Sequence, residues 1–143
     1  MMETLYFENE NVRVSYDETT GLGTAVWQGF QSSEQFRSNG LKCLQLMNEK
    51  GLTRWLADSR KMKAIRLQDQ QWVIEEFVPM LLSSPLRRMA NLVSEDIFNK
   101  MAFEQMIRRS GDLGDFRLNE FEDKAAALDW LLQPLVLPVK SGI

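Results

Sequence analysis

The sequence predicts a single α/β domain with a mixed, mostly parallel sheet, antiparallel strands at the N-terminus and about four helices. The chain has 143 residues, 44% of them apolar and 26% charged, which suits one soluble domain with its own core. Strand-like patterns fill the first 30 residues, and helical and strand-like segments then alternate. Such alternation is typical of right-handed βαβ crossovers in a parallel sheet. We therefore assign residues 1–133 to this domain and residues 134–143 to an apolar C-terminal tail.

Three short strands are predicted before residue 30. In residues 12–16 apolar and polar side chains alternate, which is the period of a half-buried strand. The other two strands are residues 5–8 and residues 22–27, and the turn cluster DETTG at residues 17–21 precedes the last of them. Together they predict an antiparallel meander.

The first helix has clear signals at both ends. Ser32 is followed three residues later by Gln35, the spacing of a capping box. At the other end, Lys50 and Gly51 supply a basic last turn and a glycine cap. Cys43 lies on the apolar face between these ends, so we expect it to be a buried packing residue.

A short strand and a longer helix follow. The run TRWLA at residues 53–57 predicts a strand covered on both faces, because it is a short apolar segment between two helical ones. Residues 67–82 predict a helix that contains Pro79. Because proline lacks an N–H and clashes with the preceding turn, we expect this helix to kink at Pro79 or to end near Val78.

The remaining elements complete the alternation. Residues 89–93 predict a buried strand, and Ser94 or Asp96 can cap a helix that runs to about Arg109. We expect three apolar residues of that helix to face inward: Ile97, Met101 and Ile107. The last strand and helix are predicted at residues 116–121 and 123–132.

The composition excludes several kinds of chemistry. The chain has no histidine and one cysteine, which excludes Ser-His-Asp and Cys-His catalysis, an internal disulfide and a cysteine-cluster metal site. No nucleophile–base pair is visible in the sequence, so we expect no enzyme activity, no cofactor and no bound metal. The net charge of −3, without a basic tail, argues against nucleic acid as a partner.

The N-terminus gives an expectation about location. The sequence MMETLYFENEN has neither the basic region nor the long apolar region of a signal peptide. No apolar run approaches the roughly 20 residues that span a bilayer. We therefore expect a cytoplasmic protein without a membrane span.

Asp58, Ser59 and Arg60 form the first candidate site. They follow the predicted strand at residues 53–57, and α/β folds place ligands beyond the carboxyl ends of their strands. One interpretation is a phosphorylation site or an anion-binding edge assisted by Arg60. The alternative is that Asp58 braces the following loop and the basic side chains are solvated.

Tryptophans supply the second candidate site. The chain has four tryptophans and eight methionines, and Trp27, Trp55 and Trp72 stand at predicted core positions. They could line a pocket for an apolar ligand, with methionine as an adaptable lining. The alternative is ordinary core packing.

The apolar tail at residues 134–143 must also be covered, and we expect it to favour a homodimer.

Six segments of the chain resemble the SpoIIAA-like (STAS and CRAL-TRIO-like) superfamily, and its small bacterial members in particular. In chain order they are LYFEN, VWQGF, RWLADSRKM, QDQQWVIEEFVP, NLVSEDIFNKM and FEDKAAALDWL. The resemblance covers most of the chain to about residue 132, and none of these segments is a catalytic motif. It implies a SpoIIAA-like fold.

The resemblance also implies two functions. The first is a non-enzymatic regulatory or protein-interaction module that acts on an unknown protein partner. The second is a small apolar-ligand or lipid-binding protein. Phospho-regulated members of the family carry an acceptor serine in an Asp-Ser-Ser-Gly-like turn. Here Asp58 and Ser59 are followed by Arg60 and Lys61, so the acceptor role does not carry over to Ser59.

Overall fold

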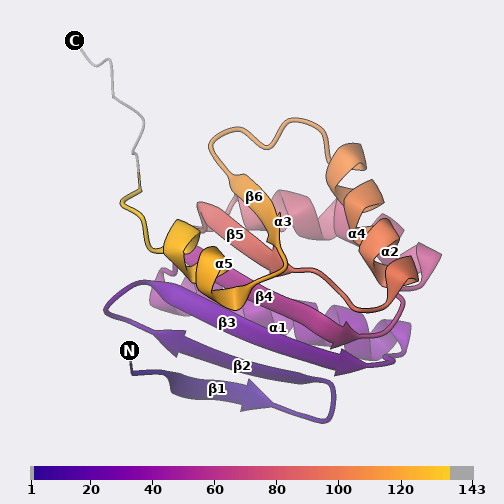
Figure 1. Cartoon of the computed structure of the whole chain (residues 1–143), viewed down its shortest axis with the longest axis horizontal. Coiled ribbons are helices and arrows are strands. Elements are labelled where there is room, and N and C mark those ends of the chain that lie inside the picture. The colour runs from indigo at the N-terminus through magenta and orange to yellow at the C-terminus, as the bar shows by residue number, and fades with distance from the viewer. Residues whose placement is uncertain (1, 136–143) are drawn as a thin grey trace.

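Six strands form a single sheet in the order β1-β2-β3-β4-β5-β6 in the computed structural model, which describes residues 2–135 (Figure 1). The first three strands are antiparallel and the last four, β3 to β6, are parallel. Their bounds are β1 Thr4–Glu8, β2 Val12–Asp17, β3 Leu22–Gly29, β4 Arg54–Met62, β5 Arg88–Leu92 and β6 Arg117–Phe121. The predicted α/β class and the mixed, mostly parallel sheet are confirmed.

Helices cover both faces of this sheet (Figure 1). Right-handed crossovers between successive parallel strands put α1, the α2–α3 helix and α4 on one face, and α5 packs on the other against its own apolar cluster. The bounds are α1 Ser33–Lys50, α2 Leu67–Trp72, α3 Val78–Leu82, α4 Ile97–Arg109 and α5 Lys124–Leu131. A larger core cluster lies on the α1 face.

Helix α1 begins and ends as its sequence predicts. The Ser32 hydroxyl accepts a hydrogen bond from the Gln35 backbone N–H at 3.1 Å, and the Gln35 side chain accepts one from the Ser32 N–H at 2.9 Å. This is the predicted capping box. Gly51 ends the helix in the left-handed conformation, with φ of 59°, and its N–H donates to the Met47 carbonyl.

Pro79 lies inside a continuous helical segment that changes its winding. Between α2 and α3, residues Val73–Phe77 form a π-helical turn, and the Val78 N–H donates to the Val73 carbonyl five residues back. The wider turn accommodates a residue that has no N–H to donate and would clash with the carbonyl four residues before it. The helix therefore continues to Leu82 rather than ending near Val78.

Two elements differ from their predictions. Strand β4 runs to Met62, well past the predicted end at residue 57, so Asp58, Ser59 and Arg60 lie inside the strand. In α4 the predicted inward side chains of Ile97 and Met101 are 65% and 55% exposed. Ile97 and Met101 point away from the core because another helical face, which contains buried Asn99 and Met106, packs inward. The third residue of the prediction, Ile107, is partly buried as expected.

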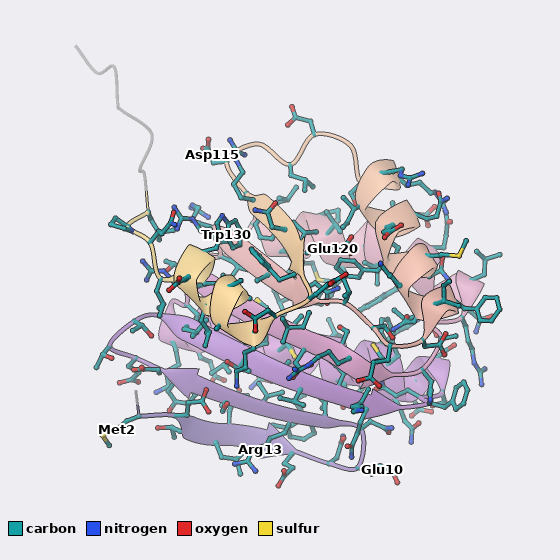
Figure 2. All side chains as sticks on the ribbon, in the orientation of Figure 1. Met2, Glu10, Arg13, Asp115, Glu120 and Trp130 are labelled. Carbon is teal, nitrogen blue, oxygen red and sulfur yellow. The ribbon has the colours of Figure 1, made fainter. Side chains whose placement is uncertain are left out.

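Two arginines hold the C-terminal end of α5 on the sheet; Figure 2 shows Trp130 on this helix. Arg54 and Arg88 are register partners on β4 and β5. Arg54 donates to the carbonyls of Thr20, of Leu131 at 2.6 Å and of Gln133 at 3.2 Å. Arg88 donates to those of Trp130, Gln133 and Pro134 at 3.1, 2.8 and 2.9 Å. The two cations therefore satisfy carbonyls that a helix end leaves free and complement its dipole.

We expect Arg54→Ala to lower the free energy of unfolding by about 2 kcal/mol, because the carbonyls lose a charged hydrogen-bond donor. Urea denaturation of the variant measures this change. Arg13→Ala is the matched control: Arg13 forms an ion pair with Glu8, and their side chains are 59% and 49% exposed. Its effect should stay within about 0.5 kcal/mol. Equal losses in the two variants would contradict the anchoring role of Arg54.

The predicted apolar tail falls largely on residues 136–143, which lie outside the described residues. Its role in a homodimer therefore stays a prediction. Among residues 2–135, no helix is both long and apolar enough to cross a bilayer.

Candidate functional site

The structure does not bring Asp58, Ser59 and Arg60 together into one site. Successive side chains of a strand point to opposite faces. Asp58 and Arg60 lie on the α5 face, where two hydrogen bonds of 3.0 and 2.8 Å join the Arg60 guanidinium to the Asp58 carboxylate. Ser59 lies on the opposite face, and its hydroxyl donates to the Asn91 amide oxygen at 2.8 Å. Because β4 continues past residue 57, its alternating side chains place Ser59 on one face and Asp58 with Arg60 on the other.

The Asp58–Arg60 pair changes the pKa of the Asp58 carboxyl group. Burial alone would raise the pKa of the Asp58 carboxyl, but hydrogen bonds from Arg60 and the charges of Arg60 and Lys124 outweigh burial and lower this pKa. A carboxyl with a lowered folded pKa stabilises the fold above its unfolded pKa of about 3.9. That contribution disappears as the pH falls through the folded value.

We expect Asp58→Asn to be less stable than the wild type at pH 7, and the difference to shrink as the pH falls below about 4. At neutral pH the variant lacks the charged partner of Arg60, whereas in acid the wild-type carboxyl is itself protonated. Urea denaturation at a series of pH values tests this expectation. A difference in stability that stays constant down to acid pH would contradict it.

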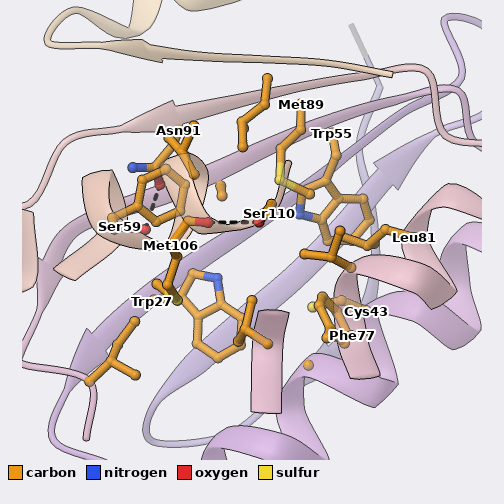
Figure 3. Close-up of a pocket in the computed structure, with 18 of the residues that line it drawn as sticks. Trp27, Cys43, Trp55, Ser59, Phe77, Leu81, Met89, Asn91, Met106 and Ser110 are labelled. Atoms are coloured by element: carbon orange, nitrogen blue, oxygen red, sulfur yellow. Dashed lines mark hydrogen bonds between the residues drawn. The ribbon is translucent and has the colours of Figure 1, made fainter. Parts of the chain in front are cut away.

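An apolar cavity of about 140 Å³ lies between the sheet and the helices of the α1 face (Figure 3). Trp27, Trp55 and Trp72, the three tryptophans predicted as a pocket, all line it. They come from β3, β4 and α2 and are 9%, 2% and 9% exposed. The sheet and a helix therefore bring residues that are distant in sequence to one cavity.

The cavity exists because the sheet presents a small side chain beneath it, which does not fill the space. Ala57 lines the cavity from β4; its register partners are Ala25 on β3 and Asn91 on β5. Aromatic rings enclose the space above the sheet. Phe36 lies between two tryptophans, with ring centroids 6.1 Å from Trp27 and 6.3 Å from Trp72. Ring pairs at these separations are favourable contacts.

Sulfur-containing side chains complete much of the lining. The methionines of the cavity are Met47, Met62, Met89 and Met106. They are flexible and polarisable, and so adapt to occupants of different shape. Cys43 also lines the cavity and is 3% exposed, which confirms its predicted burial. Burial raises the pKa of the Cys43 thiol to about 12, so this side chain is neutral and unreactive.

One end of the cavity is polar. Ser59 and Asn91 line it there, joined by their hydrogen bond (Figure 3). The same two residues also line a second compartment of about 10 Å³, together with Asn99 and Glu120. Figure 2 shows Glu120 between β6 and α4. Burial raises the pKa of the Glu120 carboxyl, and the nearby Glu104 adds to this effect.

Sequence reasoning misses Asn91 and Asn99. It treats Asn91 only as part of a buried strand, and it does not assign Asn99 to the inward face of its helix. The available signal for Asn91 is a carboxamide in the otherwise apolar run MANLV, since a buried polar group requires a partner. The spacing of Asn99, Phe103 and Met106 on one helical face would have suggested the second face of α4.

No known family model, curated protein or solved structure matches this chain. Within residues 2–135 there is also no group of histidine, cysteine or acidic side chains that could hold a metal ion. The functional inference therefore rests on the cavity and its lining.

Proposed function

We propose that the protein binds a small apolar molecule, about the size of one substituted aromatic ring, in the cavity beneath α1–α4. The observation that carries the proposal is the cavity's volume of about 140 Å³ together with its aromatic and sulfur-rich lining. An engineered apolar cavity of about 150 Å³ in another protein stays dry and binds benzene. Pockets for drug-sized ligands are larger, at about 300–1,000 Å³, so a single ring fits better than a long-chain lipid.

The expected affinity is modest. Transfer of the seven carbons of toluene from water, at about 0.8 kcal/mol each, gives about 5–6 kcal/mol. This corresponds to a dissociation constant of about 0.1 mM. The experiment therefore needs a method that works at millimolar ligand concentration.

Methionine methyl resonances provide that method. Protein labelled with ¹³C at its methionine methyl groups is titrated with toluene. We expect saturable shifts at the four cavity methionines, which are Met47, Met62, Met89 and Met106. Met101, which is 55% exposed on α4, serves as an internal control. An absence of shifts up to the solubility limit of toluene, or the largest shift at Met101, would contradict the proposal.

A regulatory or protein-interaction role remains the expectation from the family resemblance. If this role depends on phosphorylation of Ser59, the hydroxyl must first become accessible to a kinase. Ser59 is 7% exposed, and its hydroxyl donates to Asn91. A kinase would reach this hydroxyl only after β4 opened locally. Mass spectrometry of protein isolated from cells grown under several conditions tests this role, and phosphate on Ser59 would support it.

A further inference from the structure

We infer that the ligand carries one neutral hydroxyl group, and that this group occupies the small polar compartment between Asn91 and Asn99. The inference rests on the proposed function and specifies the class of ligand: a phenol or a comparably small alcohol. The apolar body would fill the cavity of about 140 Å³, and the hydroxyl would enter the adjoining space of about 10 Å³.

The compartment has the size of one oxygen-centred group. A volume of about 10–15 Å³ measured in this way accommodates one water molecule or a group of similar size. Ser59 and Asn91 belong to the lining of both spaces. Within the inference, the ring occupies the larger space and its single substituent occupies the smaller one.

The hydrogen-bonding groups of the compartment match a hydroxyl. Asn99 is 2% exposed, and its Oδ1 atom has no hydrogen-bond partner among the described residues. Asn91 is also 2% exposed, and its side-chain oxygen accepts from Ser59, which leaves its amide N–H groups to donate. A hydroxyl can donate to the first and accept from the second.

An unpaired buried acceptor is itself an argument for an occupant. Leaving a buried polar group without a partner is more unfavourable than the gain from an average hydrogen bond, and native proteins leave few such groups. Asn99 lines a space that is large enough for a donor and too small for a second ring. Its Oδ1 atom has less than 1 Å² of accessible surface, so the side-chain amide would turn to present this oxygen to the ligand. A ligand hydroxyl would supply that donor.

Charge disfavours a carboxylate ligand. No charged side chain is among the described residues that line the larger cavity. The smaller compartment has one charge of each sign in its lining, Lys100 and Glu120, so no net positive charge faces it. A carboxylate there would lie beside the Glu120 carboxyl as well as Lys100, and would lose its hydration without a net positive charge to compensate.

Three ligands on the wild-type protein test the inference without any change to the fold. Phenol and toluene have nearly the same shape and differ in a hydroxyl against a methyl group; benzoate adds a charge. All three are titrated with the methionine methyl readout. We expect phenol to bind at least as tightly as toluene, although water solvates phenol better, and benzoate to bind least.

The variant Asn99→Leu shows whether the hydroxyl is recognised where we place it. It removes the unpaired oxygen and keeps a side chain of similar volume. We expect the ratio of phenol to toluene affinity to fall about tenfold, the effect of one well-placed hydrogen bond, while toluene binding persists. The exposed Asn48 of α1 provides the matched control, and Asn48→Leu should leave the ratio unchanged.

The outcomes separate the two proposals. If toluene binds but phenol binds much more weakly in the wild type, or the ratio is the same in Asn99→Leu, the hydroxyl inference is wrong and the apolar site stands. Tightest binding of benzoate would also overturn the inference. If neither toluene nor phenol binds, both proposals fail. The three-ligand comparison on the wild type decides the matter even if Asn99→Leu does not fold.

Discussion

Gly23→Ala is expected to lower the free energy of unfolding by about 3 kcal/mol, the upper part of the range for overpacked cores. A Cβ at this position would lie under 3.0 Å from the Trp55 ring and 2.9 Å from the Leu52 Cδ1 atom. Trp55 is 2% exposed and Leu52 is fully buried. The Trp55 ring would have to shift, and the space open to it is the cavity that it lines.

Gly40→Ala is the matched control, because the same substitution should have the opposite sign there. Gly40 lies inside α1, and a Cβ would meet its nearest neighbour, a ring atom of Phe77, at 3.5 Å. That is an ordinary contact, and alanine favours a helix over glycine by about 0.8–1 kcal/mol. We expect a small gain in stability. Chemical denaturation of both variants tests the pair, and a loss at Gly40 as large as at Gly23 would contradict the steric explanation.

Ala57→Leu is expected to weaken toluene binding at least tenfold while the melting temperature is unchanged or higher. Ala57 lines the cavity from the middle of β4. Three additional carbons on this side chain would enter the empty space and remove the room for a ring. Filling an existing cavity improves packing contacts, so the loss of binding would not come from loss of the fold.

Ala126→Leu carries the same substitution away from the cavity. Ala126 is exposed on α5, on the opposite face of the sheet. We expect this variant to bind toluene as the wild type does. Weakened binding in Ala126→Leu would show that the larger side chain acts through the fold rather than through the cavity.

The fold was predictable where local signals and periodicity agree. The capping box at Ser32 and the glycine cap at Gly51 fix α1, and both have the predicted geometry. The alternation of segments predicted the mixed sheet, because crossovers between parallel strands follow one handedness. Helix α4 was less predictable, since two of its faces carry apolar residues and only packing against the other elements decides between them.

The length of β4 could not be read from the sequence. Asp58, Ser59 and Arg60 are polar, and a polar run indicates the end of a strand. In the structure each has a partner: Asp58 and Arg60 pair with each other, and Ser59 donates to Asn91. These partners satisfy polar groups that would otherwise be unfavourable in a buried strand, and one of them lies 32 residues away.

The site was predictable in its residue types but not in its volume or its polar end. The sequence suggested Trp27, Trp55 and Trp72 as a pocket and also suggested that they simply pack. The two interpretations differ by the space that remains between side chains, and this depends on the small Ala57 and on rings brought in by the helices. Periodicity contains no information about that space.

One measurement tests the central claim most directly: the toluene titration, followed by methionine methyl shifts, of the wild type and of Ala57→Leu. We expect saturable shifts at Met47, Met62, Met89 and Met106 in the wild type. In a variant that is folded and at least as stable, these shifts should require at least tenfold more toluene. Equal affinity in the two proteins, or no binding by the wild type, would contradict a ligand site in this cavity.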